Sequence, residues 1–363
     1  MALQAGIVGL PNVGKSTLFN CLSNAQAQSA NFPFCTIEPN VGTITVPDER
    51  LWKLEALVKP ERVLPTTIEI VDIAGLVKGA SKGEGLGNQF LGNIRNTNAI
   101  IHVVRCFDDP NIVHVDGSID PVRDKEIIDT ELQLKDLETL EARLQKLHKV
   151  AKAGDKVALR QVDLITKTIA HLENGKSVRS LKLESDEAEL METFQLITYK
   201  PVMYVCNVDE ASVITGNDHT KKLIESIDEN AEVLFISAAI EADIATMDRE
   251  DQVMFLEEMG LEVSGVGRLI KSAYHLLNYA TYFTAGVKEV RAWTITMGMK
   301  APQAAGVIHT DFEKGFIRAE VMAYDDFIEH GSEAACREVG KLRVEGKEYV
   351  VKDGDIMHFR FNV

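Results

Sequence analysis

At 363 residues the chain is long enough for two or three domains, and its 45% hydrophobic content can build well-packed cores. A net charge of −16 argues against a generally cationic nucleic-acid binder, although it leaves room for a local basic patch. No apolar run approaches the roughly 18 residues that a membrane span needs, no basic signal-peptide region opens the chain, and five scattered cysteines are typical of reduced cytosolic thiols. We therefore expect a cytoplasmic protein with neither a membrane nor DNA as a partner.

A complete phosphate loop follows the first predicted strand. The apolar run at residues 5–8 leads into residues 9–17, which fit G-x-x-x-x-G-K-[ST], and a helix is predicted from there to about Ser23. Backbone N–H groups of such a loop surround a polyphosphate, while its lysine reaches the β- and γ-phosphates and its first hydroxyl ligates Mg²⁺. We expect Lys15 to act on the phosphates in catalysis. The predicted phosphate site consists of Asn12, Val13, Gly14, Lys15, Ser16 and Thr17.

Two later segments have the order expected of a triphosphate switch. A proline-broken loop at residues 31–40 carries Thr36, whose hydroxyl can ligate the metal when a γ-phosphate is bound. A predicted strand over residues 67–72 ends in Asp72, which can hold Mg²⁺ directly or through water, and the N–H of Gly75 can meet the γ-phosphate. The predicted Mg²⁺ ligands are therefore Ser16, Thr36 and Asp72.

The segment after this strand is dense in glycine. Residues 75–87 leave the backbone weakly restrained, which suits a segment that orders and disorders with nucleotide state. With residues 31–40, 72–76 and 85–91 the chain resembles the Obg-related P-loop GTPases, and it resembles the YchF (Obg-like ATPase) family over essentially its whole length. Leu76 stands where Ras-type enzymes carry the glutamine that orients water. The resemblance therefore implies that hydrolysis is organised differently.

A predicted strand at residues 201–206 precedes the base-recognition segment. GTPases use Asn-Lys-x-Asp there, but this chain has Val208 in place of the lysine and Glu210 in place of the aspartate, which weakens the carboxylate geometry that guanine requires. The amide of Asn207 can instead pair with N7 and N6 of adenine, and the family resemblance also implies a preference for ATP. A strand and turn at residues 233–239 match the remaining base-side loop. The predicted base site consists of Asn207, Val208, Glu210, Ser237 and Ala238.

His114 is the candidate for activating water. It lies in a predicted loop at residues 107–117, after the strand at residues 100–104, from which it can approach the phosphates. In YchF-like proteins a histidine in this loop is regarded as catalytic, and His114 matches that motif. The residues alone leave open an exposed loop histidine that only makes local hydrogen bonds.

Residues 129–198 interrupt the nucleotide domain with predicted helices. Leucines recur at three- to five-residue spacing from Leu132 to Leu147, and helical runs follow at residues 157–170 and 184–196. A helical or coiled-coil arm is the simplest arrangement.

The arm is basic within an acidic chain. Between Arg143 and Lys182 the sequence has ten Lys or Arg and three acids, a local balance of +7. Five of them recur at i+3 or i+4 steps and are expected to share one helix face: Lys146, Lys149, Lys152, Lys156 and Arg160. Such a stripe can neutralise RNA phosphates, so we expect the ribosome or structured RNA as a partner. An ordinary solvated helix face is the alternative.

The C-terminal region has the pattern of a small mixed sheet. Strands are predicted at residues 290–296, 316–321, 348–351 and 356–361, with a loop into a short helix at residues 298–305. A single helix crossing such a sheet suggests a β-grasp module, and the segment resembles a TGS domain. It can alternatively serve only to complete the molecule's shape.

Together these patterns predict an α/β protein with a doubly wound P-loop sheet, a helical coiled-coil insertion and a C-terminal β-grasp (TGS) domain. The expected boundaries are 1–128 with 199–280 for nucleotide binding, 129–198 for the insertion and 281–363 for the TGS domain. We expect an Mg²⁺-dependent nucleoside triphosphate hydrolase that prefers ATP over GTP and acts as a nucleotide-dependent switch on the ribosome or RNA. An adaptor in which nucleotide is mainly structural and a true GTPase remain alternatives. A small-molecule kinase lacks support, because no acceptor pocket or lid arginines can be read between the motifs.

Overall fold

The computed structural model describes residues 3–28, 41–73, 87–227 and 230–362, and these residues divide into two compact units. The first unit holds residues 3–24, 41–42, 69–73, 87–227 and 230–266, and the second holds residues 25–28, 43–68 and 267–362. Among the helices in these ranges, none has both the length and the apolar character that crossing a bilayer requires.

The first sheet has the strand order β2-β4-β1-β5-β6-β7. Its strands are β1 (Gln4–Val8), β2 (Val41–Thr45), β4 (Thr67–Asp72), β5 (Ala99–Arg105), β6 (Val202–Asn207) and β7 (Val233–Ile236). Every pair that joins β4, β1, β5, β6 and β7 is parallel. All residues of β5 and β6 are buried, as expected for parallel strands covered on both faces. The carboxyl ends of β1, β4, β5 and β6 therefore share one edge, where α/β sheets bind ligands.

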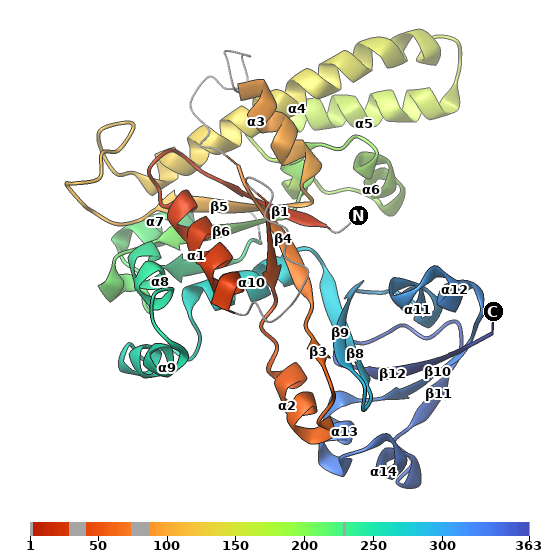
Figure 1. Ribbon diagram of the computed structural model, residues 1–363. Coiled ribbons are helices and arrows are strands. Elements are labelled where there is room, and N and C mark those ends of the chain that lie inside the picture. Colours follow the sequence, from red (N-terminus) through yellow and green to blue (C-terminus); the bar gives the residue numbers. More distant parts are fainter. Residues whose placement is uncertain (1–2, 29–40, 74–86, 228–229, 363) are drawn as a thin grey trace. The chain divides into compact units, whose positions relative to one another are not determined.

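Helices flank this sheet in the pattern of a doubly wound fold (Figure 1). They are α1 (Lys15–Gln28), α3 (Gly87–Asn96), α7 (Asp218–Glu225), α8 (Ala238–Ile244) and α9 (Arg249–Glu258), whereas α10 (Gly265–Leu276) starts at the end of this unit and belongs mainly to the second. α1 begins at Lys15, directly after the phosphate loop, and continues beyond the end at Ser23 that the sequence predicts. The described strands and α1 confirm the predicted order of strand, phosphate loop and helix.

A long helical hairpin projects from the first unit (Figure 1). It consists of α4 (Pro121–Ala151) and α5 (Lys156–Glu173), with α6 (Ser185–Glu192) packed beside them. α4 starts at Pro121 because the Asp120 side chain caps it by accepting from the Arg123 N–H. The helix therefore crosses the domain boundary that the sequence predicts at residues 128 and 129. Leu140, Leu164 and Ile165 lie in the buried core of the hairpin.

The second unit contains a mixed sheet with the order β11-β10-β12-β8-β9-β3. Its strands are β3 (Val63–Leu64), β8 (Tyr279–Ala285), β9 (Val290–Thr296), β10 (Phe316–Met322), β11 (Arg343–Glu345) and β12 (Ile356–Phe361). β12 pairs with β8, and β3 with β9, in parallel, whereas the other pairs are antiparallel. The helices are α2 (Glu49–Val58), α11 (Ala301–Ile308), α12 (Thr310–Lys314), α13 (Tyr324–His330) and α14 (Glu333–Glu338).

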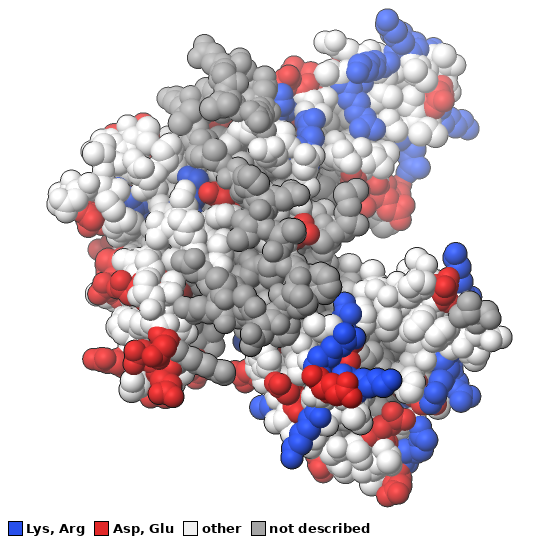
Figure 2. Space-filling model, viewed as in Figure 1, with Lys and Arg blue, Asp and Glu red and all other residues white. Residues whose placement is uncertain are grey.

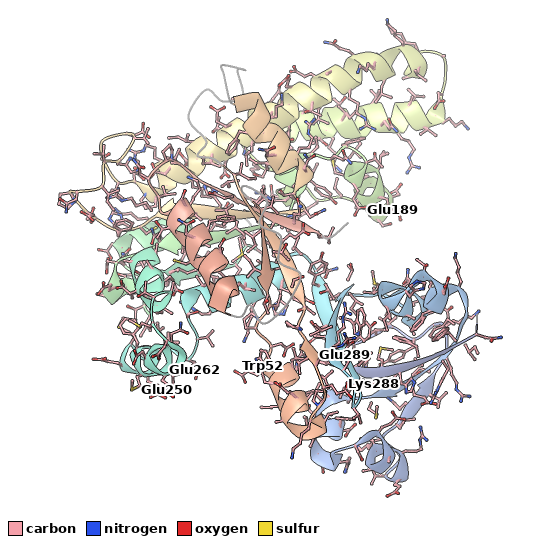
Figure 3. All side chains as sticks on the ribbon, viewed as in Figure 1. Trp52, Glu189, Glu250, Glu262, Lys288 and Glu289 are labelled. Atoms are coloured by element: carbon pink, nitrogen blue, oxygen red, sulfur yellow. The ribbon has the colours of Figure 1, made fainter. Side chains whose placement is uncertain are left out.

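This unit differs from the predicted C-terminal module in three ways. α2 and β3 belong to it, although the sequence assigns residues 43–68 to the nucleotide domain. The reason is burial, since Leu51 and Leu54 of α2 pack against Phe283 while Trp52, between them, stays 44% exposed (Figure 3). The predicted strand at residues 348–351 forms only an isolated bridge between Val350 and Lys300. The sequence predicts a single helix in this region, whereas four short helices, α11 to α14, follow β9.

Candidate functional site

Two glycines of the phosphate loop are required by its geometry. Gly9 and Gly14 have φ angles of 153° and 97°, and Asn12 between them has a φ of 61°. A Cβ atom at Gly9 would collide with the carbonyl oxygen of Val103, and one at Gly14 would collide with the side-chain amide of Asn207. The loop is therefore packed tightly against β5 and β6.

Lys15 lies folded over the phosphate loop. Its Nζ donates a hydrogen bond to the carbonyl oxygen of Leu10 at 2.6 Å, and the residue is only 6% exposed. Burial lowers the pKa of Lys15 to about 8, while the nearby charge of Asp72 opposes the shift. The ammonium group retains donor capacity for a phosphate, because it can donate three hydrogen bonds.

Asp72, at the carboxyl end of β4, has a buried oxygen that lacks a partner. Its Oδ1 has no hydrogen-bond donor among the described residues. Burial raises the pKa of Asp72, and the charge of Lys15 opposes this shift. A buried carboxylate oxygen without a donor suits a hard cation or its water ligand, and the exposed hydroxyl of Ser16 supplies another oxygen. The donor set therefore fits Mg²⁺. Two predicted site residues, Thr36 and Gly75, lie outside the described residues.

Asn207 binds protein groups where the sequence predicts a bond to the base. Its Nδ2 donates to the carbonyl oxygen of Val13 at 3.0 Å, and its Oδ1 accepts from the N–H of Ala238 at 3.0 Å. The residue is 4% exposed, so its amide must be satisfied internally. One N–H and one lone pair stay available for a base. Asn207 thus joins the phosphate loop to the base-side loop.

The other predicted base-site residues surround this junction. Val208 is buried, and Ser237 caps α8 by accepting from the N–H of Ile240 at 3.4 Å. Glu210 is exposed at the start of a short 3-10 turn, Glu210–Ser212. The exposed carboxylate of Glu210 is available to a ligand, whereas the carboxylate of Asp209 accepts from the Ser212 hydroxyl at 2.9 Å.

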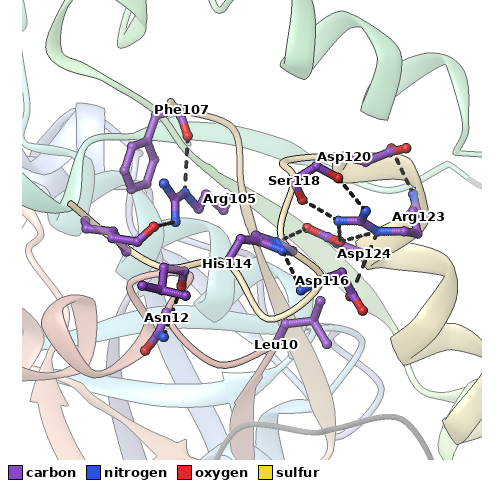
Figure 4. Close-up of polar contacts among 12 residues, drawn as sticks. Leu10, Asn12, Arg105, Phe107, His114, Asp116, Ser118, Asp120, Arg123 and Asp124 are labelled. Carbon is purple, nitrogen blue, oxygen red and sulfur yellow. Dashed lines mark hydrogen bonds and ion pairs between the residues drawn. The ribbon is translucent and has the colours of Figure 1, made fainter. Parts of the chain in front are cut away.

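His114 is buried and both of its ring nitrogens are occupied (Figure 4). Its Nε2 lies 2.8 Å from Oδ2 of Asp124, in the first turn of α4, and its Nδ1 accepts from the N–H of Asp116 at 3.1 Å. The sequence allows an exposed loop histidine as the alternative to a catalytic one, but the side chain of His114 is 5% exposed. The described arrangement makes His114 a buried partner of Asp124.

Arg105 fixes the first half of the loop that carries His114. Its buried guanidinium donates to the carbonyl oxygens of Phe107, Asp109 and Ile112 at 3.2, 3.0 and 2.9 Å. It also lies over the ring of Phe107, whose carbonyl oxygen it reaches (Figure 4). Arg105 and His114 line a cavity of about 580 Å³. Sequence reasoning missed Arg105, although a charged residue that ends a strand of apolar residues was a usable signal.

The cluster of His114, Asp116 and Asp124 has the composition of a metal site. The hydrogen bonds argue against that use. The Asp116 N–H requires a lone pair on Nδ1, so the neutral ring carries its proton on Nε2, the nitrogen that faces Asp124. Arg123 also donates to Oδ1 of Asp124 at 2.8 Å. These residues therefore form a hydrogen-bonded group.

The five basic residues predicted to share a helix face are divided between two helices. Lys146 and Lys149 end α4, Lys152 lies in the turn, and Lys156 and Arg160 begin α5. The single face predicted by the sequence is wrong, because Gly154 adopts a φ of 88° and Asp155 then caps a new helix. All five are exposed and gather near the end of the hairpin (Figure 2). Arg160 pairs with Asp186, whereas none of the four lysines has an ion-pair partner in the described part of the chain.

Comparison with known proteins places these features in context. Residues 4–148 match a family model described as a 50S ribosome-binding GTPase. Residues 279–362 match a model for the C-terminal region of YchF GTPases, described as a protein of unknown function (DUF933). The ribosome-binding ATPase YchF of Haemophilus ducreyi is 56% identical, and that of Bacillus subtilis 54% identical, each over 100% of both chains.

Comparison with solved structures identifies the same family. The Schizosaccharomyces pombe YchF GTPase matches with a TM-score of 0.90 at 40% identity, covering 99% of this chain and 97% of that one. A GTP-binding protein from Pyrococcus horikoshii has the same fold, with a TM-score of 0.62 at 19% identity over 99% of this chain and 100% of that one.

Proposed function

This chain belongs to the YchF family of P-loop nucleoside triphosphatases, and we propose that it hydrolyses ATP, in preference to GTP, as a nucleotide-dependent switch that binds the ribosome. The observation that carries this proposal is that Lys15, which follows β1, and Asp72, which ends the neighbouring parallel strand β4, lie at the same edge of the first sheet. Lys15 supplies a cation for the phosphates, and Asp72 supplies a carboxylate oxygen that has no donor among the residues that the structure describes. The protein is proposed to act in the cytoplasm.

Different residues of the chain would bind the triphosphate, hold the metal and activate the attacking water. The phosphate loop, from Asn12 to Thr17, binds the triphosphate through its backbone N–H groups, and Lys15 orients the β- and γ-phosphates. Ser16, Asp72 and Thr36 would hold Mg²⁺, which when bound neutralises charge on the phosphate oxygens. His114 would position or deprotonate the attacking water after it leaves its present hydrogen bonds.

The choice of ATP over GTP rests on the base-side residues. Glu210 replaces the aspartate that guanine requires, and its exposed carboxylate starts one methylene farther from the backbone. The names of the relatives differ on this point, since the curated bacterial proteins are called ATPases and the S. pombe structure is titled a GTPase. Nucleotide competition therefore tests this part of the proposal.

The test measures displacement of a fluorescent ATP analogue by ATP and by GTP. We expect ATP to compete at least about tenfold better, the discrimination that one misplaced polar contact imposes. Glu210→Asp restores the shorter carboxylate on an exposed residue, and it should shift the ratio toward GTP. Lys15→Ala is the control, because it should weaken both nucleotides equally. Equal competition by ATP and GTP would establish a true GTPase or an unselective site.

The proposed role of His114 is tested by single-turnover hydrolysis. We expect His114→Ala to slow cleavage by about 100-fold, the low end of the usual contribution of a positioned acid or base, while ATP affinity stays the same. His275→Ala is the control and should leave cleavage unchanged, because His275 lies in the last turn of α10. If His114→Ala cleaves ATP at the parent rate, the assignment fails.

We propose that the hairpin contacts the ribosome, because its end is positively charged. The four lysines near the hairpin end, which have no ion-pair partner in the described ranges, can neutralise RNA phosphates. Acidic residues gather around α9, including Glu250 and Glu262 (Figures 2 and 3). Lys146→Glu with Lys149→Glu should reduce co-sedimentation with ribosomes about tenfold or more at physiological salt. Lys221→Glu with Lys222→Glu, an equal charge change on exposed residues of α7, should leave it unchanged. Equal co-sedimentation of the two variants would remove the hairpin from the interface.

Two observations favour a second function, an adaptor in which bound nucleotide is mainly structural. Both ring nitrogens of His114 are already engaged, and Leu76 offers no group for water. The adaptor predicts ribosome binding without measurable single-turnover cleavage. The proposed switch predicts cleavage, together with changes around Thr36 and Gly75 when the γ-phosphate is lost. We also propose that the C-terminal region, residues 281–363, is a TGS domain.

A further inference from the structure

The hydrogen bonds of His114 define a single arrangement of its protons. Because the Asp116 N–H points to Nδ1, that nitrogen carries the lone pair of the neutral ring, and the proton lies on Nε2. This Nε2–H donates to Oδ2 of Asp124 at 2.8 Å. The one lone pair that could accept a proton from water is thus already used by the backbone.

Both side chains of this hydrogen-bonded pair are buried. The side chain of His114 is 5% exposed and that of Asp124 is 2% exposed. A general base must reach its water at hydrogen-bond distance. In the described arrangement His114 has no free ring nitrogen and its side chain is almost entirely buried, so it cannot act on a water molecule; we call this its resting state.

Asp124 is itself held in place by the neighbouring arginine. Nε and Nη2 of Arg123 donate to Oδ1 of Asp124 at 3.1 and 2.8 Å. The same guanidinium donates to the hydroxyl of Ser118 at 3.0 Å and to the Ser118 carbonyl oxygen at 2.6 Å (Figure 4). Arg123 therefore balances the charge of Asp124 and ties the end of the loop to the first turn of α4.

The two partners belong to different parts of the fold. His114 lies in the loop after β5, whereas Asp124 lies on a 31-residue helix capped by Asp120. A displacement of the loop relative to α4 would break the bond between them without unfolding either element. The hydrogen bond between His114 and Asp124, which we call the hold, can therefore break and re-form as the loop moves.

From this geometry we propose that Asp124, supported by Arg123, is a positioning residue that keeps His114 at rest, and that opening this hold limits hydrolysis. The inference rests on the proposed function, in which His114 acts on the attacking water. It assigns Asp124 the opposite effect from the aspartate of a catalytic triad, which keeps its histidine ready to accept a proton.

The first experiment compares single-turnover ATP hydrolysis by the parent protein and by Asp124→Asn, which preserves the size of the side chain. The hydrogen bond from Nε2–H then ends on a neutral amide instead of a charged carboxylate and is weaker, so we expect a rate increase on the order of tenfold with ATP affinity unchanged. Combining it with His114→Ala should abolish the increase. A decrease as large as that of His114→Ala alone would overturn the proposal and make Asp124 a triad-like partner.

The second experiment follows His114 itself and does not depend on activity. Diethyl pyrocarbonate acylates accessible imidazoles, and peptide mass spectrometry reports the rate at each histidine. We expect slow acylation of His114 in the parent protein and acylation on the order of tenfold faster in Asp124→Asn. The exposed His309 should react equally in both proteins. Equal rates at His114 would overturn the proposal.

Two further variants separate the hold from general damage to α4. Asp129→Asn removes the 2.8 Å ion pair with Lys125 on the same helix, and it should leave His114 acylation unchanged. Arg123→Gln removes the support of Asp124 and should accelerate acylation even if Asp124→Asn folds poorly. Faster acylation in Arg123→Gln together with parent-like hydrolysis by His114→Ala would retain the hold and reject the proposed catalytic role. Slow acylation in a folded Arg123→Gln would reject the hold.

Discussion

The side-chain amide of Asn12 donates a hydrogen bond to the carbonyl oxygen of Val113, 3.2 Å away. This contact joins the phosphate loop to the residue that precedes His114. Occupancy of the phosphate site can therefore act on the His114 loop through one side chain.

Replacing Asn12 tests this connection. Asn12→Gly removes the amide but suits the φ of 61° better than any other substitution, so loop conformation is preserved. We expect amide hydrogen exchange of residues 113–117 to accelerate on the order of fivefold, as one exposed hydrogen bond is lost. ATP affinity should change by less than about threefold. Unchanged exchange in residues 113–117 would show that the contact does not restrain the loop.

The bridging position of Asn207 predicts a strong effect on both nucleotides. Asn207→Ala leaves the Val13 carbonyl and the Ala238 N–H without partners, at about 1–3 kcal/mol for each buried group. We expect ATP and GTP affinity to fall together by roughly 100-fold in a binding titration. Asp248→Ala, which removes the α9 cap, should cost about 1 kcal/mol of stability and leave nucleotide affinity intact. A loss confined to ATP would show that Asn207 acts mainly through the base.

The pKa of about 8 at Lys15 predicts a pH-dependent affinity for nucleotide. The lysine must be charged to bind phosphate, and above about pH 8 the free protein increasingly loses that proton. Binding must then restore it, so affinity should fall as pH rises, by at most tenfold per pH unit. Calorimetry in buffers of different ionisation enthalpy should detect proton uptake near pH 9. Lys15→Arg should lose this dependence, and a parent affinity constant up to pH 10 would contradict the prediction.

The lowered pKa of Lys15 also determines how the stability of the fold changes with pH. The folded pKa of Lys15 lies below its value of 10.5 in an unfolded chain, so burial of the charged form costs stability below about pH 8. That cost disappears as the pH rises from about 8 to 10.5. Bound phosphate removes the cost at lower pH.

Packing in the hairpin predicts a local loss of stability. Leu140 is fully buried in the cluster that joins α4 and α5, and Leu140→Ala should cost about 2–5 kcal/mol. Hydrogen exchange of α5 amides should accelerate accordingly. Leu134→Ala, at a position on α4 that is 40% exposed, is the control and should change exchange little. Equal effects of the two variants would contradict the assignment of the core.

The phosphate loop and the strands around it could be predicted because each depends on local sequence. Parallel strands buried on both faces appear as apolar runs, and Gly9 and Gly14 mark positions where only glycine fits. β3, in contrast, has two residues, too few for any periodic pattern, and it joins the second sheet through pairing with β9. Its place depends on contacts between distant residues.

The same limit applies to the site. Asp124 is an ordinary acid in the first turn of a helix, and nothing local indicates that it meets His114. The partners of Asn207 lie far along the chain, at Val13 and Ala238, so its use within the protein could not be read from the sequence. The basic stripe was predicted on one helix because the residue spacing continues across the turn at Gly154.

The central claim is that the phosphate loop and Asp72 together receive a metal-bound triphosphate. A crystal structure with Mg²⁺ and a non-hydrolysable ATP analogue tests it most directly. We predict the β- and γ-phosphates within hydrogen-bond reach of Lys15 and the cation ligated by Ser16, with Asp72 beside it. A triphosphate bound elsewhere, or a Ser16 hydroxyl turned away from the cation, would contradict the account.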